Sequence, residues 1–90
     1  MLYKWKKETD IMTRNEIYER INKVFREVFD NDNLIVNDST KADDVNGWDS
    51  LMHITLISEI EDEFDVCFEM KDITRMQNLG ELVDKIMQLL

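Results

Sequence analysis

The sequence contains no proline, two glycines, one cysteine and one histidine among its 90 residues. The absence of proline and the scarcity of glycine argue against a turn-rich β sandwich and favour helices. A single cysteine, Cys67, cannot form a disulfide framework or a cysteine-rich metal site, so we expect no metal. One histidine and no glycine-rich phosphate loop leave little for nucleophilic catalysis or nucleotide binding, so we do not expect an enzyme.

The chain also lacks a long hydrophobic run and an excess of positive charge. No uncharged stretch approaches the roughly 20 residues of a membrane span, and no signal peptide is visible, so we expect a cytoplasmic protein without a membrane partner. The 20 Asp and Glu outnumber the 11 Lys and Arg, and this excess opposes binding to nucleic-acid phosphates. The net charge of −9 discourages self-association, so we expect a monomer.

The acidic charge is concentrated between residues 43 and 72. This segment holds ten Asp and Glu against Lys71 alone, and its sum of −9 equals the net charge of the chain. One interpretation is a solvated helix face. The other is a surface that attracts basic partners and fixes their orientation.

The spacing of apolar residues divides the chain into an extension and one domain. Residues 1–11 mix lysines with aromatic side chains and show no apolar period. They are an N-terminal extension, a start upstream of the natural one or, as a weaker option, a short basic helix on a membrane surface. A capping-box spacing of Thr13 and Glu16 begins a helix, so we place the domain at residues 12–90.

Apolar residues at spacings of three and four predict the helices of this domain. The expected ranges are 14–29, 49 or 50 to 64, 70–75, and from 79 to the C-terminus. We expect Asp49 and Asn78 to cap the second and last of these helices, and Leu89 to lie on the buried face of the last. The fold class is therefore all-α: a small four-helix bundle of three long helices, with a short one between the second and the last.

Three further positions carry specific expectations. In the long connection over residues 34–48, we expect Leu34, Ile35 and Val45 to reach the core. On the second helix Leu51 falls among polar residues, so we expect it to be exposed. His53 falls near the centre of the apolar face, where a core histidine with satisfied hydrogen bonds is more common than a base or a metal ligand.

The segment from Asn46 to Leu51 carries the functional information. A serine placed first on a helix, with an acid before it and an exposed leucine after it, resembles the attachment site of acyl carrier proteins. The spacing from Ser50 to Phe64, Phe68 and the last helix is similar to that family as well. The resemblance extends from Met12 to the C-terminus.

The resemblance implies a covalent prosthetic group, 4′-phosphopantetheine from coenzyme A, on Ser50. A separate magnesium-dependent phosphopantetheinyl transferase attaches it in this family. The thiol of the arm carries acyl or aminoacyl groups as thioesters and presents them to loading and transferring enzymes, while the carrier itself catalyses nothing. These enzymes and the transferase are the expected partners.

The resemblance also assigns roles to three sets of residues. The cofactor-binding set is Trp48, Asp49, Ser50 and Leu51. The partner-binding set is Leu51, Met52, Thr55, Glu59, Asp62 and Glu63. The candidates for an acyl pocket between the helices are His53, Leu56, Ile57, Ile60, Phe64, Phe68, Ile73 and Met76.

The sequence departs from the fatty-acid carriers of this family in two ways. Those carriers usually have acids two and five positions after the serine, where this chain has Met52 and Thr55. Trp48 and His53 resemble instead the stand-alone carriers of specialised pathways, such as nonribosomal peptide, polyketide or surface-glycan acylation systems. The alternative from a different class is an acidic helical interaction module that carries no prosthetic group.

Overall fold

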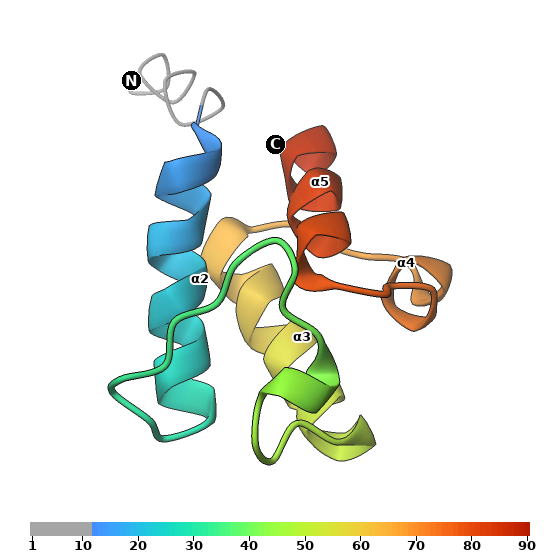
Figure 1. The fold of residues 1–90 in the computed structure, drawn as a ribbon. Coiled ribbons are helices and arrows are strands. Elements are labelled where there is room, and N and C mark those ends of the chain that lie inside the picture. The colour runs from blue at the N-terminus through green and yellow to red at the C-terminus, as the bar shows by residue number, and fades with distance from the viewer. Residues whose placement is uncertain (1–11) are drawn as a thin grey trace.

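The structure is a computed structural model that describes residues 12–90, and the prediction for residues 1–11 lies outside the described residues. The helices are α2 (Arg14–Val28), the short 3₁₀-helix η1 (Ala42–Asp44), α3 (Ser50–Phe64), α4 (Met70–Thr74) and α5 (Leu79–Leu89) (Figure 1). The predicted all-α bundle of three long helices and a short one is confirmed. Within residues 12–90 no helix has the length and apolarity to cross a membrane.

Side-chain caps fix where the first and last of these helices begin. The Thr13 hydroxyl accepts from the Glu16 N–H at 3.2 Å, and the Glu16 carboxylate accepts from the Thr13 N–H at 2.9 Å, which completes the predicted capping box. At α5 the Asn78 side chain accepts from the Glu81 N–H at 3.1 Å. Each cap pairs N–H groups that the helix itself leaves without a partner.

The core lies where the apolar faces of α2, α3 and α5 meet. The main buried residues of these three helices are Ile17, Ile21, Val24, Phe25, Leu56, Ile57, Ile60, Phe64, Leu79, Leu82, Val83 and Ile86. The expectation for Leu89 is wrong, because its side chain is 40% exposed. At 100° per residue Leu89 lies about 70° from the centre of the α5 stripe, in the last turn of the helix.

The connection from α2 to η1 runs along α2, and the expectation that Ile35 reaches the core is wrong. Ile35 is 72% exposed, whereas Val36 is 3% exposed. The side chain of Asn22 accepts from the Val36 N–H at 2.7 Å, and Arg26 Nε donates to the Leu34 carbonyl at 2.8 Å. Successive side chains of an extended segment point to opposite sides, so turning Leu34 and Val36 inward turns Ile35 to solvent.

Arg14 joins the first turn of α2 to this connection and to α5. Its guanidinium donates to the carboxylates of Asp38 at 2.8 Å and Asp84 at 2.7 Å, and to the carbonyl of Gly80 at 3.3 Å. The Tyr18 hydroxyl also donates to Asp38. The hydrogen bonds from Arg14 and then Tyr18 lower the pKa of Asp38, while burial and the contact with Asp38 raise the pKa of Tyr18.

The same connection also fixes the start of α5. The carbonyls of Thr40 and Asp38 accept from the N–H groups of Leu79 at 2.8 Å and Gly80 at 2.9 Å. A Cβ atom added to Gly80 would lie 2.9 Å from the Asp38 carbonyl oxygen and 3.2 Å from its Cβ. Glycine is therefore required for the close approach of the two backbones.

Candidate functional site

Ser50 is the first residue of α3, and a turn and a cap place it there. Gly47 turns the chain with a φ of +92°, a conformation that favours glycine. Asp49 caps α3 as predicted, with its carboxylate accepting from the Met52 N–H at 2.9 Å and its carbonyl accepting from the His53 N–H at 2.8 Å. The result is an exposed Ser50 at the start of a capped helix.

Trp48 and His53 lie on either side of this helix start and contact each other. The Trp48 indole nitrogen donates to His53 Nδ1 at 3.0 Å, and the two rings lie edge to edge with their centroids 5.8 Å apart and their planes 21° from parallel. Trp48 is 7% exposed and packs edge-on against Phe25 at 5.3 Å and near Phe29 at 6.1 Å. His53 is half-buried, so it belongs to the edge of the core rather than its centre, and its Nδ1 is satisfied.

A cleft of about 460 Å³ opens beside Ser50. It lies between the start of α3, η1 and α4, and its lining is Ala42, Trp48, Asp49, Ser50, His53, Ile54, Met70, Ile73 and Thr74. Five of these nine residues were predicted to be at the site. Sequence reasoning missed Ile54, although a residue four positions after Ser50 lies on the same face of a helix. It gave no signal for Met70 or Thr74, which α4 brings to the cleft.

The other predicted pocket and cofactor residues lie elsewhere. Leu56, Ile57, Ile60, Phe64 and Phe68 are buried in the core and do not line the cleft. Leu51 is 73% exposed, as predicted, and also stands outside the cleft lining. The cleft therefore joins Ser50 to the surface between α3 and α4, while the apolar face of α3 is occupied by core packing.

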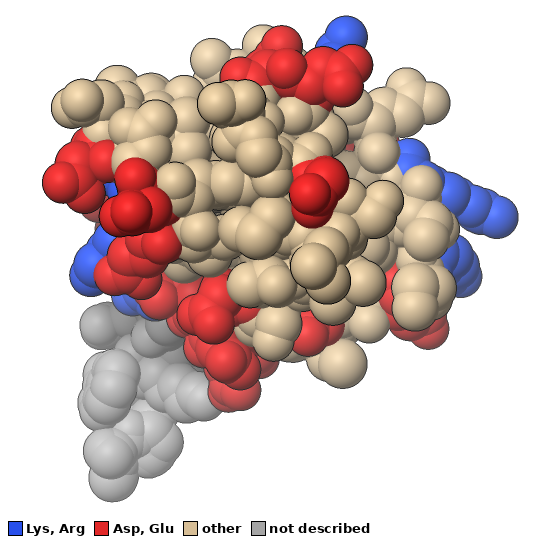
Figure 2. Space-filling view, turned by 90° about the horizontal axis from the view of Figure 1, so that it is seen from below, with Lys and Arg blue, Asp and Glu red and all other residues tan. Residues whose placement is uncertain are grey.

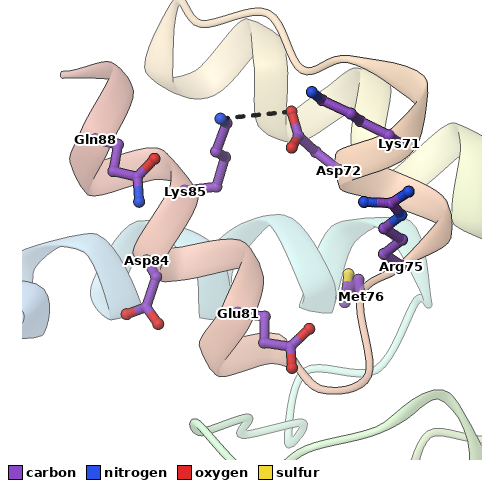
Figure 3. A pocket seen from close by; sticks show the side chains of 8 residues that line it. All are labelled: Lys71, Asp72, Arg75, Met76, Glu81, Asp84, Lys85 and Gln88. Carbon is purple, nitrogen blue, oxygen red and sulfur yellow. Dashed lines mark ion pairs between the residues drawn. The ribbon is translucent and has the colours of Figure 1, made fainter.

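Met76 lies at a second cleft, of about 290 Å³, between α4 and α5. Its lining is Lys71, Asp72, Arg75, Met76, Glu81, Asp84, Lys85 and Gln88. Figure 3 shows Lys85 of α5 facing Asp72 of α4, with their charged atoms 3.7 Å apart. Positive and negative side chains balance here, so this cleft differs in chemistry from the apolar one beside Ser50.

The predicted partner-binding residues differ in exposure, and the Thr55 hydroxyl donates to the Leu51 carbonyl at 3.4 Å. Leu51, Thr55, Glu59 and Asp62 are exposed, and Met52 is half-buried. Glu63 is half-buried and lies 3.8 Å from the guanidinium of Arg20.

Two more apolar side chains are exposed near Ser50. Ile54 is 67% exposed and Met70 is 73% exposed, and both line the cleft.

Figure 2 views the end of the molecule at which α3 begins. The middle of this face is mostly uncharged, and most acidic side chains stand around it.

The site contains an exposed serine hydroxyl, an apolar cleft and a buried tryptophan that joins the start of α3 to the core. In residues 12–90 no three His, Cys, Asp or Glu side chains are grouped so that they could hold a metal ion. A small helical bundle that presents a serine in this way has the architecture of a carrier domain, which holds a covalently attached group for other proteins.

The comparisons with known proteins identify the family. The family model described as the phosphopantetheine attachment site matches residues 19–86, and the chain belongs to this family. The structure is similar to the solution structure of a holo acyl carrier protein from Geobacter metallireducens, with a TM-score of 0.75 and 30% sequence identity over 81% of this chain and 84% of that chain. No curated protein matches the chain significantly.

Membership of this family confirms the predicted carrier role and the predicted cofactor, 4′-phosphopantetheine. Proteins of this kind are not enzymes themselves. The residues of the site fit the group: a serine hydroxyl is exposed for phosphodiester formation, and the cleft beside it has a lining of mainly apolar side chains that an extended arm can contact.

Proposed function

We propose that Ser50 is the residue that carries 4′-phosphopantetheine. The segment that matches the family contains three serines: Ser39, Ser50 and Ser58. The Ser39 hydroxyl donates to the Asn37 side chain at 2.8 Å within a turn, and Ser58 is two turns farther along α3. Ser50 alone of the three lines the cleft, and this observation carries the proposal.

The residues around Ser50 prepare it for modification. The Asp49 carboxylate accepts a hydrogen bond from the Met52 N–H, and this bond fixes the first turn of α3. Ser50 remains exposed, so a transferase can reach it. The unpaired N–H groups and the positive dipole end of this first turn favour a phosphodiester. When bound, the arm supplies a thiol that holds an acyl or aminoacyl group as a thioester.

The surface around Ser50 supports a role in a specialised pathway rather than in fatty-acid synthesis. The positions two and five residues after Ser50 are the uncharged Met52 and Thr55. Exposed Leu51 gives partner enzymes an apolar contact, and the acids Glu59 and Asp62 lie farther along α3. Partners are therefore recognised by an apolar centre with an acidic rim, and the rim sets orientation more than affinity.

The carrier unit that we propose is residues 12–90, acting as a monomer. The capping box at Thr13 closes the first turn of α2 without using residues before Met12. Removing residues 1–11 should therefore leave the thermal melting temperature unchanged. Light scattering of the full chain should give the mass of one copy.

The test is the intact mass of the purified protein before and after incubation with coenzyme A, Mg²⁺ and a broad-specificity phosphopantetheinyl transferase. The wild type should gain one phosphopantetheinyl unit, and Ser50→Ala should gain none. Ser39→Ala and Ser58→Ala are matched controls that should still be loaded. No gain in a folded sample, with a known carrier fully modified alongside, would overturn the assignment and favour an acidic interaction module.

A further inference from the structure

His53 and Ser50 line the same cleft, three residues apart on α3. Side chains at this spacing lie on one face of a helix, with Cβ atoms about 5–6 Å apart. Whatever is attached to the Ser50 hydroxyl therefore leaves the helix beside the imidazole ring. Of the nine residues that line the cleft, His53 is the one basic side chain. The ring N–H of Trp48, which also lines the cleft, is already donated to His53, so the imidazole is the ring that can donate to an anion there.

The contact with Trp48 determines which nitrogen of His53 carries the proton. An indole N–H donates and cannot accept, so the 3.0 Å hydrogen bond requires a lone pair on His53 Nδ1. The neutral imidazole then holds its proton on Nε2. The hydrogen bond holds the two rings nearly coplanar, with an interplanar angle of 21°, and the packing of Trp48 on Phe25 fixes the indole, so the orientation of the imidazole is fixed as well.

Nε2 is the part of the ring that remains for a ligand. The bond from Trp48 occupies Nδ1, at the edge of the ring nearer the core. His53 is half-buried and lines the cleft, and no buried side-chain nitrogen or oxygen in residues 12–90 lacks a partner. Nε2–H is therefore a donor that the cleft and solvent can reach, with its tautomer set in advance.

We propose that His53 is a positioning residue for the prosthetic arm: its Nε2–H donates to the phosphodiester on Ser50 and directs the arm into the cleft. This inference rests on the proposed attachment at Ser50. A hydrogen bond to an anionic oxygen is stronger than one between neutral groups, and the buried Trp48 holds the donor in place before the arm arrives.

The expected consequence is an arm that lies against the cleft rather than extending into solvent. The apolar side chains that it would contact are Ile54, Met70 and Ile73. In the absence of the His53 donor, this apolar lining alone would have to overcome the conformational entropy of a long flexible chain. The arm would then lose its preferred direction.

The test compares the apo and holo forms by NMR spectroscopy, after intact mass has confirmed complete loading of each variant. In the apo protein the imidazole ¹⁵N spectrum should show the tautomer with the proton on Nε2. In the holo protein the ³¹P resonance of the phosphodiester should differ from its position in the urea-unfolded holo protein. Nuclear Overhauser contacts should join the arm to the methyl groups of Met70 and Ile73.

Three variants separate positioning from a general structural effect. His53→Leu should load but move the ³¹P resonance toward the unfolded-state position and lose the contacts between arm and cleft. His53→Gln, which keeps an N–H donor at a similar distance from the backbone, should restore part of both signals. Trp48→Phe keeps an aromatic ring on Phe25 but removes the indole donor, so His53 should populate both tautomers and the contacts should weaken.

Equal ³¹P positions and equal arm contacts in wild type and folded His53→Leu would overturn the positioning role, while the mass gain would leave attachment at Ser50 intact. An apo wild type with the proton on Nδ1 would overturn it as well. Absence of the mass gain in wild type, with a known carrier modified alongside, would remove the proposed function and this inference together.

Discussion

The side chains of Trp48 and His53 form a hydrogen bond of 3.0 Å across the five-residue step that contains Ser50. Trp48 is buried against Phe25 of α2, so this bond ties the start of α3 to the core of the bundle. The backbone adds the Asp49–His53 hydrogen bond that begins the helix. Ser50 is therefore exposed on a segment that side-chain and backbone hydrogen bonds connect to the core.

The coupling between Trp48 and His53 is measurable with a double-mutant cycle. Trp48→Phe and His53→Leu each remove one partner of the hydrogen bond, and the double variant removes both. We expect a coupling free energy of about 1 kcal/mol from urea unfolding curves, the typical contribution of one intramolecular hydrogen bond. Trp48→Phe combined with Leu51→Ala is the control, because Leu51 is exposed and should be additive with it. Additivity in the first cycle would contradict the prediction.

Replacement of Gly80 by alanine should destabilise the protein, against the intrinsic preference of the helix. Alanine in a helix is favoured over glycine by about 1 kcal/mol. Here the new Cβ would meet the backbone oxygen of Asp38 at 2.9 Å, and that backbone is held by its own bond to the Gly80 N–H. We expect a net loss of about 1–3 kcal/mol in the free energy of unfolding, as for other overpacked sites.

Ser58→Ala is the matched control for this substitution. Ser58 is exposed in the middle of α3, so alanine there should be neutral or slightly stabilising. A stabilised Gly80→Ala protein would show that the connection between α2 and η1 can move away from α5. Thermal melts of the two variants and the wild type decide the sign.

The helices were predictable because their causes are local. Apolar periodicity located α2, α3 and α5, and the caps Thr13, Asp49 and Asn78 can be read from sequence because a cap acts within three residues of chain. The exposure of Leu51 followed from its position on the polar side of α3.

The connection between α2 and η1 and the cleft were not predictable in the same way. The choice of Val36 over Ile35 as a core anchor depends on Asn22, fourteen residues earlier in the chain, whose side chain sets the register. Likewise Met70 lines the cleft because the fold places α4 on the opposite side of it from the start of α3, a tertiary arrangement that no short spacing encodes. Trp48 beside His53 was visible as a pair of unusual residues, but not as a hydrogen bond.

The contribution of Asp38 to stability should depend on pH. Its pKa in the folded protein is lowered, first by Arg14 and then by Tyr18, so the unfolded chain binds a proton at this carboxyl more readily than the folded one. The stabilisation is therefore complete above the ordinary aspartate pKa of about 3.9 and is lost as the pH falls through the lower folded value.

Asp38→Asn measures the pH-dependent contribution of the Asp38 carboxylate to stability, because asparagine keeps an acceptor oxygen but cannot be charged. The wild type should be more stable than the variant at pH 7, and the two urea midpoints should converge in acid. Glu59→Gln, which removes one exposed carboxylate from α3, controls for the change in net charge. A difference between wild type and Asp38→Asn that persists unchanged below pH 3 would contradict this account of the Arg14–Asp38 contact.

Leu51 should matter to partner enzymes but not to folding. Its side chain is 73% exposed next to Ser50, and Ile35 provides a control of equal exposure, 72%, on a connection that does not line the cleft. Leu51→Gln and Ile35→Gln should each change the free energy of unfolding by less than about 0.5 kcal/mol.

For the phosphopantetheinyl transferase, Leu51→Gln should lower kcat/KM by about 5- to 30-fold, as loss of an apolar contact worth about 1–2 kcal/mol would. Ile35→Gln should leave kcat/KM unchanged. Equal effects of the two substitutions would mean that the transferase senses the apolar surface of the whole molecule rather than the residue beside the proposed attachment serine.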